Sequence, residues 1–173
     1  NASVTTVAPT GTISIIAGCS SGIEPLFAVA YVRKAEEGEE FTECSGAFEE
    51  YAKKTRIWSP ELCKDILNEG GIAAIHKIPE EAKKLFVTAH EISWQWHVQI
   101  AAAFQKYTDA GVSKTVNLPQ SATVEDIKDV FLAAHKLKCK GITVFRAGCK
   151  KESALSVKPE DTGRFRAPSL RNI

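Results

Sequence analysis

Hydroxyl-bearing residues and glycine cluster in the short segment that follows the first predicted strand. Thr10, Gly11, Thr12, Ile13 and Ser14 come directly before a stretch that can begin a helix. Glycine lets the backbone approach a ligand closely, and the first turn of a helix offers unpaired N–H groups and the positive end of its dipole. Together with the hydroxyl groups, these features suit a phosphate or a diphosphate. The segment is not a Walker A loop, because no Gly-Lys-Ser/Thr follows it, and a plain strand-to-helix turn capped by threonine is the structural alternative.

A second glycine-bounded segment, residues 18–22 (Gly-Cys-Ser-Ser-Gly), matches the Gly-x-Ser-x-Gly pattern of a hydrolase nucleophile elbow. In that hypothesis Ser20 is the nucleophile. The elbow needs a strand before it and a helix after it, whereas Pro25 follows closely and residues 26–33 are typical of a buried strand. No His-Gly-Gly oxyanion motif is present. We therefore favour a simple turn.

The other polar side chains that could do chemistry form no recognisable constellation. The histidines show no His-Glu-x-x-His spacing, and His97 and His135, both on predicted helices, are expected to be satisfied or surface residues. Glu24 stands in an otherwise apolar loop, so its carboxylate is either paired or functional.

The five cysteines, at positions 19, 44, 63, 139 and 149, are odd in number and widely spaced. They form no CxxC pair and no cluster with the spacing of a zinc site. The sequence shows no secretory signal pattern, so we expect reduced thiols in a cytoplasmic protein.

Strands alternate with helices along the chain, which predicts an α/β fold with parallel strands and crossover helices. The clearest unit is a βαβ near the C-terminal end, where a helix with a capping box at Thr123 and Asp126 joins two strands. Trp96, Ile100 and Phe104 share one face of an earlier helix with Ala103 and Tyr107. The predicted strands are 3–8, 26–33, 113–118 and 141–145, and the predicted helices are 45–54, 59–68, 79–85, 93–107 and 123–137, with 13–17 either helical or extended and 34–43 charged and exposed.

Composition bounds the class of protein. A chain of 173 residues suffices for one domain, and a net charge of +1 does not favour nucleic acid or a membrane surface. No run approaches the ~20 apolar residues of a membrane-spanning helix. The sequence has no methionine, even at position 1, so we expect a piece of a longer polypeptide. We expect residues 1–152 to form the folded domain and 153–173 a basic, mobile tail with a short ordered stretch near 153–157.

Several motifs in order resemble one family. Residues 8–14 (Ala-Pro-Thr-Gly-Thr-Ile-Ser) and 20–25 (Ser-Ser-Gly-Ile-Glu-Pro) are similar to the late part of the catalytic subunit of ribonucleotide reductase, in particular of its adenosylcobalamin-dependent class. Three further stretches agree, namely 101–109, 112–119 and 122–144. The resemblance covers about residues 1–152.

The resemblance implies a fold, a site and partners. The fold is a ten-stranded α/β barrel, of which this chain would supply the C-terminal portion. Thr10, Gly11, Thr12, Ile13 and Ser14 would line the site for the substrate diphosphate, with the turn at 20–25 packed beneath. The complete enzyme would reduce ribonucleoside diphosphates through a thiyl radical, with adenosylcobalamin as cofactor and a thioredoxin-like or other dithiol reductant. It would be cytoplasmic and homo-oligomeric.

Three departures from the family pattern qualify that resemblance. The family's Asn-x-Cys-x-Glu radical motif is absent, so no catalytic residue is assigned and the chain is expected to be inactive without the N-terminal part of the barrel. The strand at 141–145 lacks the Tyr-Tyr pair of the oxygen-dependent class, which fits a cobalamin enzyme. Trp94 stands where relatives usually carry Pro. The alternative function is a non-catalytic half-barrel that binds a nucleotide or a partner.

Overall fold

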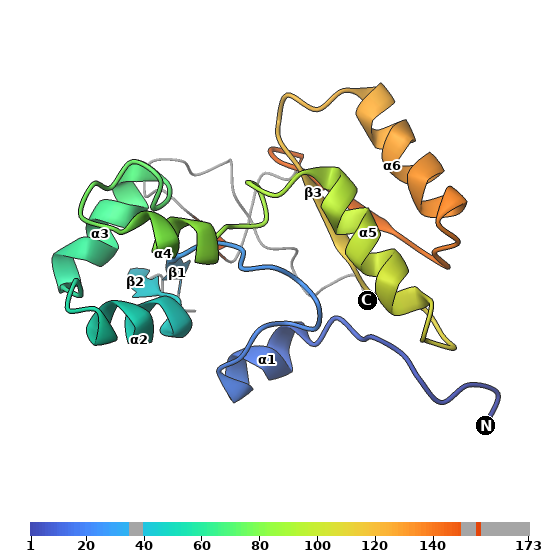
Figure 1. The fold of residues 1–173 in the computed structure, drawn as a ribbon, viewed down its shortest axis with the longest axis horizontal. Coiled ribbons are helices and arrows are strands. Elements are labelled where there is room, and N and C mark those ends of the chain that lie inside the picture. Colours follow the sequence, from blue (N-terminus) through green and yellow to red (C-terminus); the bar gives the residue numbers. More distant parts are fainter. Residues whose placement is uncertain (35–39, 150–154, 157–173) are drawn as a thin grey trace. The chain divides into compact units, whose positions relative to one another are not determined.

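The structure is a computed structural model, and it describes residues 1–34, 40–149 and 155–156. The chain divides into two compact units (Figure 1). The first unit comprises residues 1–25 and 89–149, and the second comprises residues 26–88 with the C-terminal segment.

A parallel βαβ arrangement forms the centre of the first unit. Strands β3 (Thr115–Leu118) and β4 (Thr143–Arg146) pair in parallel, with Thr115 opposite Thr143, and α6 (Val124–Lys136) connects them. Helix α5 (Trp94–Gln105) precedes β3 and contacts both β3 and α6. The prediction of a βαβ unit is confirmed. The capping box is also present, because Thr123 Oγ1 accepts the Asp126 N–H while the Asp126 carboxylate accepts the Thr123 N–H.

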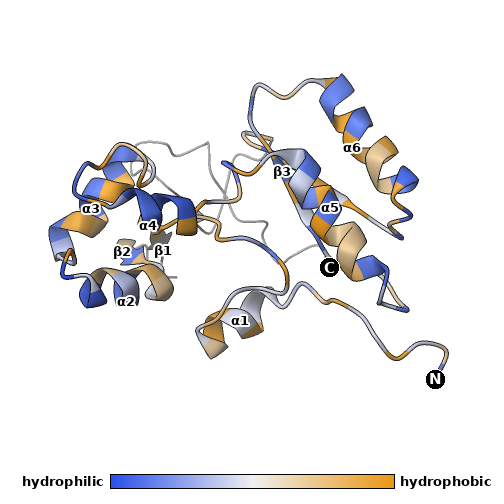
Figure 2. Ribbon diagram, viewed as in Figure 1, coloured by the Kyte–Doolittle hydropathy of each residue, from blue (hydrophilic) through white to orange (hydrophobic). Residues whose placement is uncertain are grey.

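The apolar face that the sequence indicates on α5 is exposed to solvent in this structure. Trp96 and Tyr107 are 64% and 77% exposed, and Ile100, Ala103 and Phe104 are exposed as well. The residues of α5 that are buried are His97, Val98, Ala101 and Gln105, two of which are polar. Figure 2 shows that this helix carries both hydrophobic and hydrophilic residues along its length. The 3.6-residue pattern of apolar residues therefore marks the exposed face of α5 and not the face turned toward the core.

The core of the first unit is small. It is built by inward residues of α5, β3 and α6 and by Ala122, which lies just before α6, and its members are Val98, Val116, Leu118, Ala122, Val130 and Ala134. Two other apolar residues of α6, Val124 and Phe131, are exposed. Helix α6 therefore contributes only part of its apolar residues to this core.

The N-terminal segment joins the first unit by backbone contacts. The predicted strand at 3–8 forms only an isolated parallel bridge between Val7 and Val112. It is followed by α1 (Gly11–Ala17), which resolves the ambiguity at 13–17 in favour of a helix. Gly18 ends this helix in the left-handed conformation, at φ 64°.

The second unit contains an antiparallel sheet, where the sequence predicted parallel strands. Strand β1 (Ala30–Lys34) pairs with β2 (Glu40–Cys44) on one side and with β5 (Leu155–Ser156) on the other. The strand predicted at 26–33 thus begins later. The charged segment predicted at 34–43 contributes β2, and its residues 35–39 lie outside the described part of the chain. The same is true of the predicted tail, apart from β5.

Three helices cover this unit and begin and end close to the predicted bounds. They are α2 (Gly46–Lys54), α3 (Pro60–Glu69) and α4 (Glu80–Leu85). Ser59 caps α3 by accepting the Leu62 N–H at 3.1 Å, and Gly70 ends it at φ 72°. Phe48 and Phe86 meet edge to face in the core, with ring centroids 5.2 Å apart.

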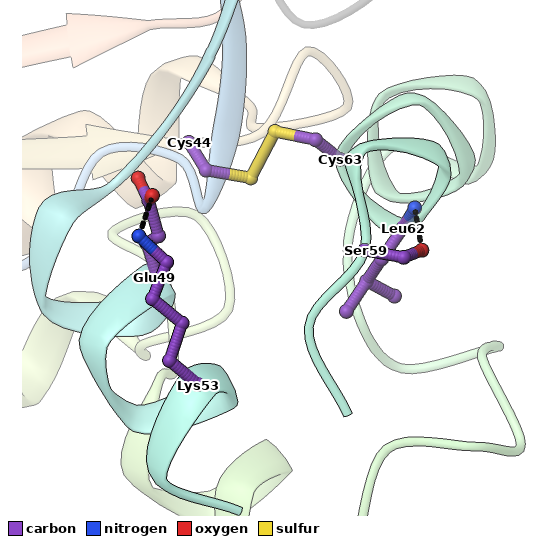
Figure 3. Close-up of a disulfide and its surroundings, with 6 residues drawn as sticks. All are labelled: Cys44, Glu49, Lys53, Ser59, Leu62 and Cys63. Atoms are coloured by element: carbon purple, nitrogen blue, oxygen red, sulfur yellow. Dashed lines mark hydrogen bonds and ion pairs between the residues drawn. A yellow bond between two sulfur atoms is a disulfide. The ribbon is translucent and has the colours of Figure 1, made fainter. Parts of the chain in front are cut away.

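A disulfide links two elements of the second unit. Cys44, at the end of β2, is bonded to Cys63 on α3, and their Cα atoms are 6.0 Å apart (Figure 3). The prediction that all five thiols are reduced is therefore wrong for this pair. Cys19, Cys139 and Cys149 are free. Cys63 is buried on α3 beside the end of β2, and this placement brings the two sulfur atoms within bonding distance. The wide spacing of the cysteines in the sequence did not indicate this pair.

Among the helices of the described ranges, none combines the length and the apolar character that crossing a bilayer requires.

We predict that Cys44→Ser lowers the free energy of unfolding of the second unit by about 3 kcal/mol, because the bond closes a loop with a sequence separation of 19 residues. Urea unfolding with and without reductant measures the change. Cys19→Ser, at a free and exposed cysteine, is the matched control and is expected to leave stability unchanged. Equal stability of Cys44→Ser and the parent protein would contradict the prediction.

Candidate functional site

The predicted phosphate-binding segment forms the start of α1. Thr10 is the N-cap residue and adopts a left-handed conformation (φ 51°, ψ 26°), which is uncommon for a β-branched residue. Its carbonyl accepts the Ser14 N–H at 2.9 Å, whereas its side chain makes no capping hydrogen bond. The N–H groups of Gly11, Thr12 and Ile13 precede the first intrahelical bond. The hydroxyl of Thr10 and these amides are thus available at one end of the helix.

The five predicted site residues differ in their environment. Thr12 and Ile13 are exposed, and Gly11 is half-buried. Ser14 is buried, and its hydroxyl donates to the Gly11 carbonyl at 2.9 Å. The hydroxyl hydrogen of Ser14 is therefore used within the helix, and the free hydroxyl groups at this end belong to the two threonines.

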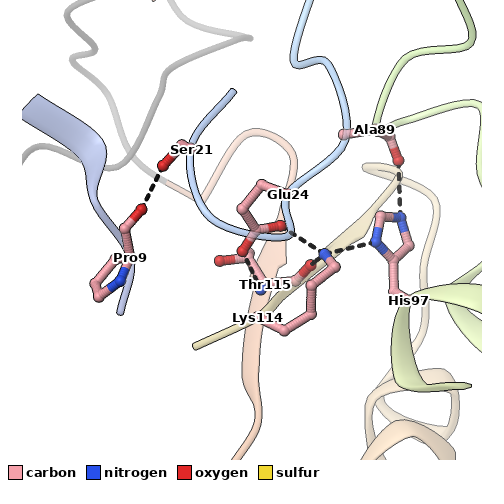
Figure 4. Close-up of polar contacts among 7 residues, drawn as sticks. All are labelled: Pro9, Ser21, Glu24, Ala89, His97, Lys114 and Thr115. Atoms are coloured by element: carbon pink, nitrogen blue, oxygen red, sulfur yellow. Dashed lines mark hydrogen bonds and ion pairs between the residues drawn. The ribbon is translucent and has the colours of Figure 1, made fainter. Parts of the chain in front are cut away.

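Residues 18–25 lie against the residues that lead into α1. The Ser21 hydroxyl donates to the Pro9 carbonyl, as Figure 4 shows. Gly22 has φ +52°, and a Cβ at this position would lie 2.9 Å from the Ala8 carbonyl oxygen, so glycine is required here. Because this segment follows the end of a helix and not a strand, Ser20 does not stand on a nucleophile elbow.

An ion pair between the buried Lys114 and the half-buried Glu24 connects this segment to the strand region. Lys114 Nζ lies 2.6 Å from Glu24 Oε2, and the side chain of Lys114 is only 1% exposed (Figure 4). The other carboxylate oxygen of Glu24, Oε1, accepts the Thr115 N–H at 2.7 Å. Both carboxylate oxygens of Glu24 therefore have partners. The sequence left open whether Glu24 is paired or functional, and the structure shows that it is paired.

His97 completes this buried network. Its Nδ1 lies 2.9 Å from Lys114 Nζ, and its Nε2 lies 3.0 Å from the Ala89 carbonyl oxygen. An ammonium group only donates, so Nδ1 must accept and the ring proton must sit on Nε2, which donates to Ala89. Lys114 also donates to the Thr115 carbonyl. The three ammonium hydrogens of Lys114 therefore have three acceptors.

Burial and charge hold His97 neutral. Burial lowers its pKa, and the neighbouring Lys114 ammonium lowers it further, against a smaller opposing effect of the Ala89 carbonyl and Glu24. Burial also lowers the pKa of Lys114, and Glu24 opposes that shift by hydrogen bonding and by charge. The arrangement is a structural salt bridge with a fixed histidine tautomer. Within the described residues, no group of three or more His, Cys, Asp or Glu side chains could hold a metal ion.

The sequence analysis did not single out Lys114, although a signal was present. In an extended segment, alternate residues face the same side, and Lys114, Val116 and Leu118 are all buried. A lysine in register with two core positions predicts a buried charge, and a buried charge requires a partner. Glu24, a carboxylate in an apolar loop, is that partner.

Comparison with known proteins shows the family. The family described as "Ribonucleotide reductase, barrel domain" matches residues 1–145. This match includes α1, the Glu24–Lys114 pair and the βαβ unit. The chain therefore belongs to the ribonucleotide reductase barrel domain family.

Two curated relatives are similar over most of this chain. A vitamin B12-dependent ribonucleoside-diphosphate reductase of Thermoplasma acidophilum is 50% identical over 162 residues, which cover 94% of this chain and 21% of the relative. An enzyme of the same name from Mycobacterium tuberculosis is 46% identical over 156 residues, or 90% of this chain and 22% of the relative. The chain thus spans about a fifth of the length of these relatives.

A solved structure supports the fold. The class Id ribonucleotide reductase alpha subunit of Actinobacillus ureae matches with a TM-score of 0.67 and 25% identity, over 80% of this chain and 25% of that chain. The α/β character predicted from the sequence is confirmed by the family match and this neighbour.

We predict that the first unit loses stability as the pH falls below about 6.5. The folded state keeps His97 and His90 neutral, because burial lowers both pKa values, while the unfolded chain takes up protons near the ordinary value of 6.5. The unfolded state then binds more protons, so the free energy of unfolding decreases with falling pH. Urea unfolding at about pH 7 and about pH 5 measures this slope.

Substitution of His97 tests how much of this pH dependence of the free energy of unfolding is due to that histidine. His97→Gln removes one of the two neutral imidazoles and is expected to make the slope shallower. His135→Gln, at an exposed position near the end of α6, is the control that keeps the full slope. A slope unchanged by His97→Gln would show that this network does not set the pH dependence.

Proposed function

We propose that this chain is part of a ribonucleoside-diphosphate reductase, which converts ribonucleotides to deoxyribonucleotides by a thiyl-radical mechanism. The observation that carries the proposal is the family match over residues 1–145, together with two relatives whose names state that activity. The alternative of a non-catalytic half-barrel that binds a nucleotide or a partner has no comparable support, since the relatives are named as reductases. The chain is an oxidoreductase fragment and is inactive alone.

In this proposal the start of α1 holds the substrate diphosphate. Thr10, Gly11, Thr12, Ile13 and Ser14 line the site. The exposed hydroxyl of Thr12, the uncapped hydroxyl of Thr10 and the amides of the first helical turn can all donate to phosphate oxygens. No acidic residue occupies the first turn, so nothing there repels a polyanion. Ser14 supports the turn through its hydrogen bond to Gly11.

Adenosylcobalamin is the cofactor of the complete enzyme in this proposal, as the names of the relatives indicate vitamin B12 dependence. The buried imidazole of His97 uses both ring nitrogens within the fold, so it is not a ligand for cobalt. We derive no step through the cofactor and assign it no contact with this chain.

The remaining partners follow from the same assignment. Residues 1–152 are proposed to be a partial catalytic barrel that needs the N-terminal part of a ten-stranded barrel, in a homo-oligomeric enzyme. The sequence contains no Asn-x-Cys-x-Glu motif, so the radical cysteine and its partners lie outside this chain. A thioredoxin-like or other dithiol would supply the electrons. We propose a cytoplasmic location, where the Cys44–Cys63 disulfide would be unusual.

We predict that Thr12→Val in the complete reductase raises the KM for the ribonucleoside diphosphate about tenfold. The change keeps the shape of the side chain and removes one hydrogen bond to a charged group, which contributes about 1.5–3 kcal/mol. Steady-state kinetics of the reductase with the diphosphate substrate measures the effect.

Thr42→Val is the matched control, because Thr42 is an exposed strand residue of the second unit where valine is well accommodated. It is expected to leave the KM unchanged. If Thr12→Val shows parental kinetics, Thr12 does not contact the diphosphate and the assignment of this site fails.

A further inference from the structure

The segment that carries the proposed diphosphate site is held at both of its ends by the same short stretch of chain, residues 111–115. Residues 8–23 form an excursion that contains α1, and the residues on either side of it are both held by residues 111–115. The position of the site relative to β3 therefore depends on two anchors.

The first anchor is made by backbone groups. The Val7 N–H donates to the Gly111 carbonyl at 3.3 Å, and the Val7 carbonyl accepts the Ser113 N–H at 2.8 Å. These bonds form the parallel bridge at Val112. They fix where the excursion begins, whatever the side chains are.

The second anchor is made by charged side chains. Glu24 receives Lys114 Nζ on one carboxylate oxygen and the Thr115 N–H on the other. Residues just before Glu24 turn back on the start of the excursion, because the Ser21 hydroxyl donates to the Pro9 carbonyl and Gly22 lies against the Ala8 carbonyl. A displacement of Glu24 would thus be passed to the residues that enter α1.

We propose that Lys114 and Glu24 form a positioning pair that fixes α1 in its diphosphate-binding place, with Lys114 acting through Glu24. The inference rests on the proposed function, since it assumes that the start of α1 holds the diphosphate. Lys114 does not contact the substrate, because its side chain is 1% exposed and its three hydrogens already have acceptors in Glu24, His97 and Thr115.

The charge of Lys114 makes this pair a sensitive anchor. Removing one partner of a buried pair leaves the other charge without compensation, so the remaining group moves or takes in water. Lys114→Met keeps the volume and leaves the Glu24 carboxylate unpaired on one oxygen. Glu24→Gln keeps an acceptor for the Thr115 N–H, but it places an amide NH2 opposite Lys114 and so removes both the charge and the acceptor for the ammonium.

The test uses the complete reductase with Lys114→Met, Glu24→Gln and the double variant. Each single variant is expected to raise the KM for the ribonucleoside diphosphate about tenfold or more, since a displacement of about 1 Å can cost roughly 100-fold. The affinity for the unphosphorylated nucleoside stays at the parental value. The double variant is expected to have a KM no higher than that of the single variant with the larger increase, because both substitutions break the same interaction.

Lys128→Met is the matched control. It breaks the exposed ion pair of Lys128 with Glu125 on α6, whose atoms are 3.1 Å apart, by the same chemical change. It is expected to leave both affinities unchanged. If Lys114→Met does not fold, Glu24→Gln carries the test, because it preserves shape and one hydrogen bond.

Amide hydrogen exchange with added inorganic diphosphate separates the inference from the proposed function. In the parent enzyme, diphosphate is expected to protect residues 10–14. In Lys114→Met, residues 8–23 exchange faster while α6 keeps its protection, and the diphosphate concentration for half protection rises about tenfold. Protection with an unchanged midpoint overturns the inference and leaves the proposed function standing. No protection in the parent enzyme overturns the proposed function and this inference with it.

Discussion

The ion pair between Lys114 and Glu24 is the interaction on which the first unit depends. A lysine ammonium group that is almost fully buried needs an acceptor for each of its hydrogens, and here they come from a loop carboxylate, a helix imidazole and a backbone carbonyl. One side chain thereby ties residues 18–25 and α5 to the start of β3. The same requirement fixes the tautomer of His97 and its bond to Ala89.

The candidate site at the start of α1 contains no charged residue of its own, because residues 10–14 offer only hydroxyl and amide groups. The Lys114 ammonium is paired with Glu24 within the fold and is not available to a ligand. Binding of a diphosphate then depends on how well neutral donors are placed, and less on attraction by a free cation. A site of this kind requires rigid support, which the bridge at Val7 and the contacts of Glu24 supply.

Local signals predicted much of the fold. The caps at Ser59 and Thr123 and the glycine at 70 lie where the helices begin and end, because these side chains and backbone conformations act over three or four residues. The βαβ unit was predicted for the same reason. Of the candidate site residues, the five at 10–14 were predicted from their types and from the family resemblance, and their role in binding diphosphate stays a prediction. Glu24 was recognised from the sequence as paired or functional, and the structure shows it paired.

The features that sequence reasoning missed depend on contacts distant in the chain. The antiparallel partner of β1, the bond of Cys44 to Cys63 and the partner of Lys114 each join segments that no local pattern connects. The inward face of α5 was not predicted, because half of its buried residues are polar, namely His97 and Gln105, and packing against β3 and α6 buries them.

In the function proposed above, the start of α1 holds a substrate diphosphate while Glu24 and Lys114 keep the helix in place. The decisive experiment is a crystal structure of the complete reductase with a ribonucleoside diphosphate. We expect diphosphate oxygens about 2.7–3.2 Å from the Thr12 hydroxyl and the first amides of α1, with the Glu24–Lys114 pair intact. A diphosphate bound elsewhere, or one bound here with that pair broken, would contradict this proposal.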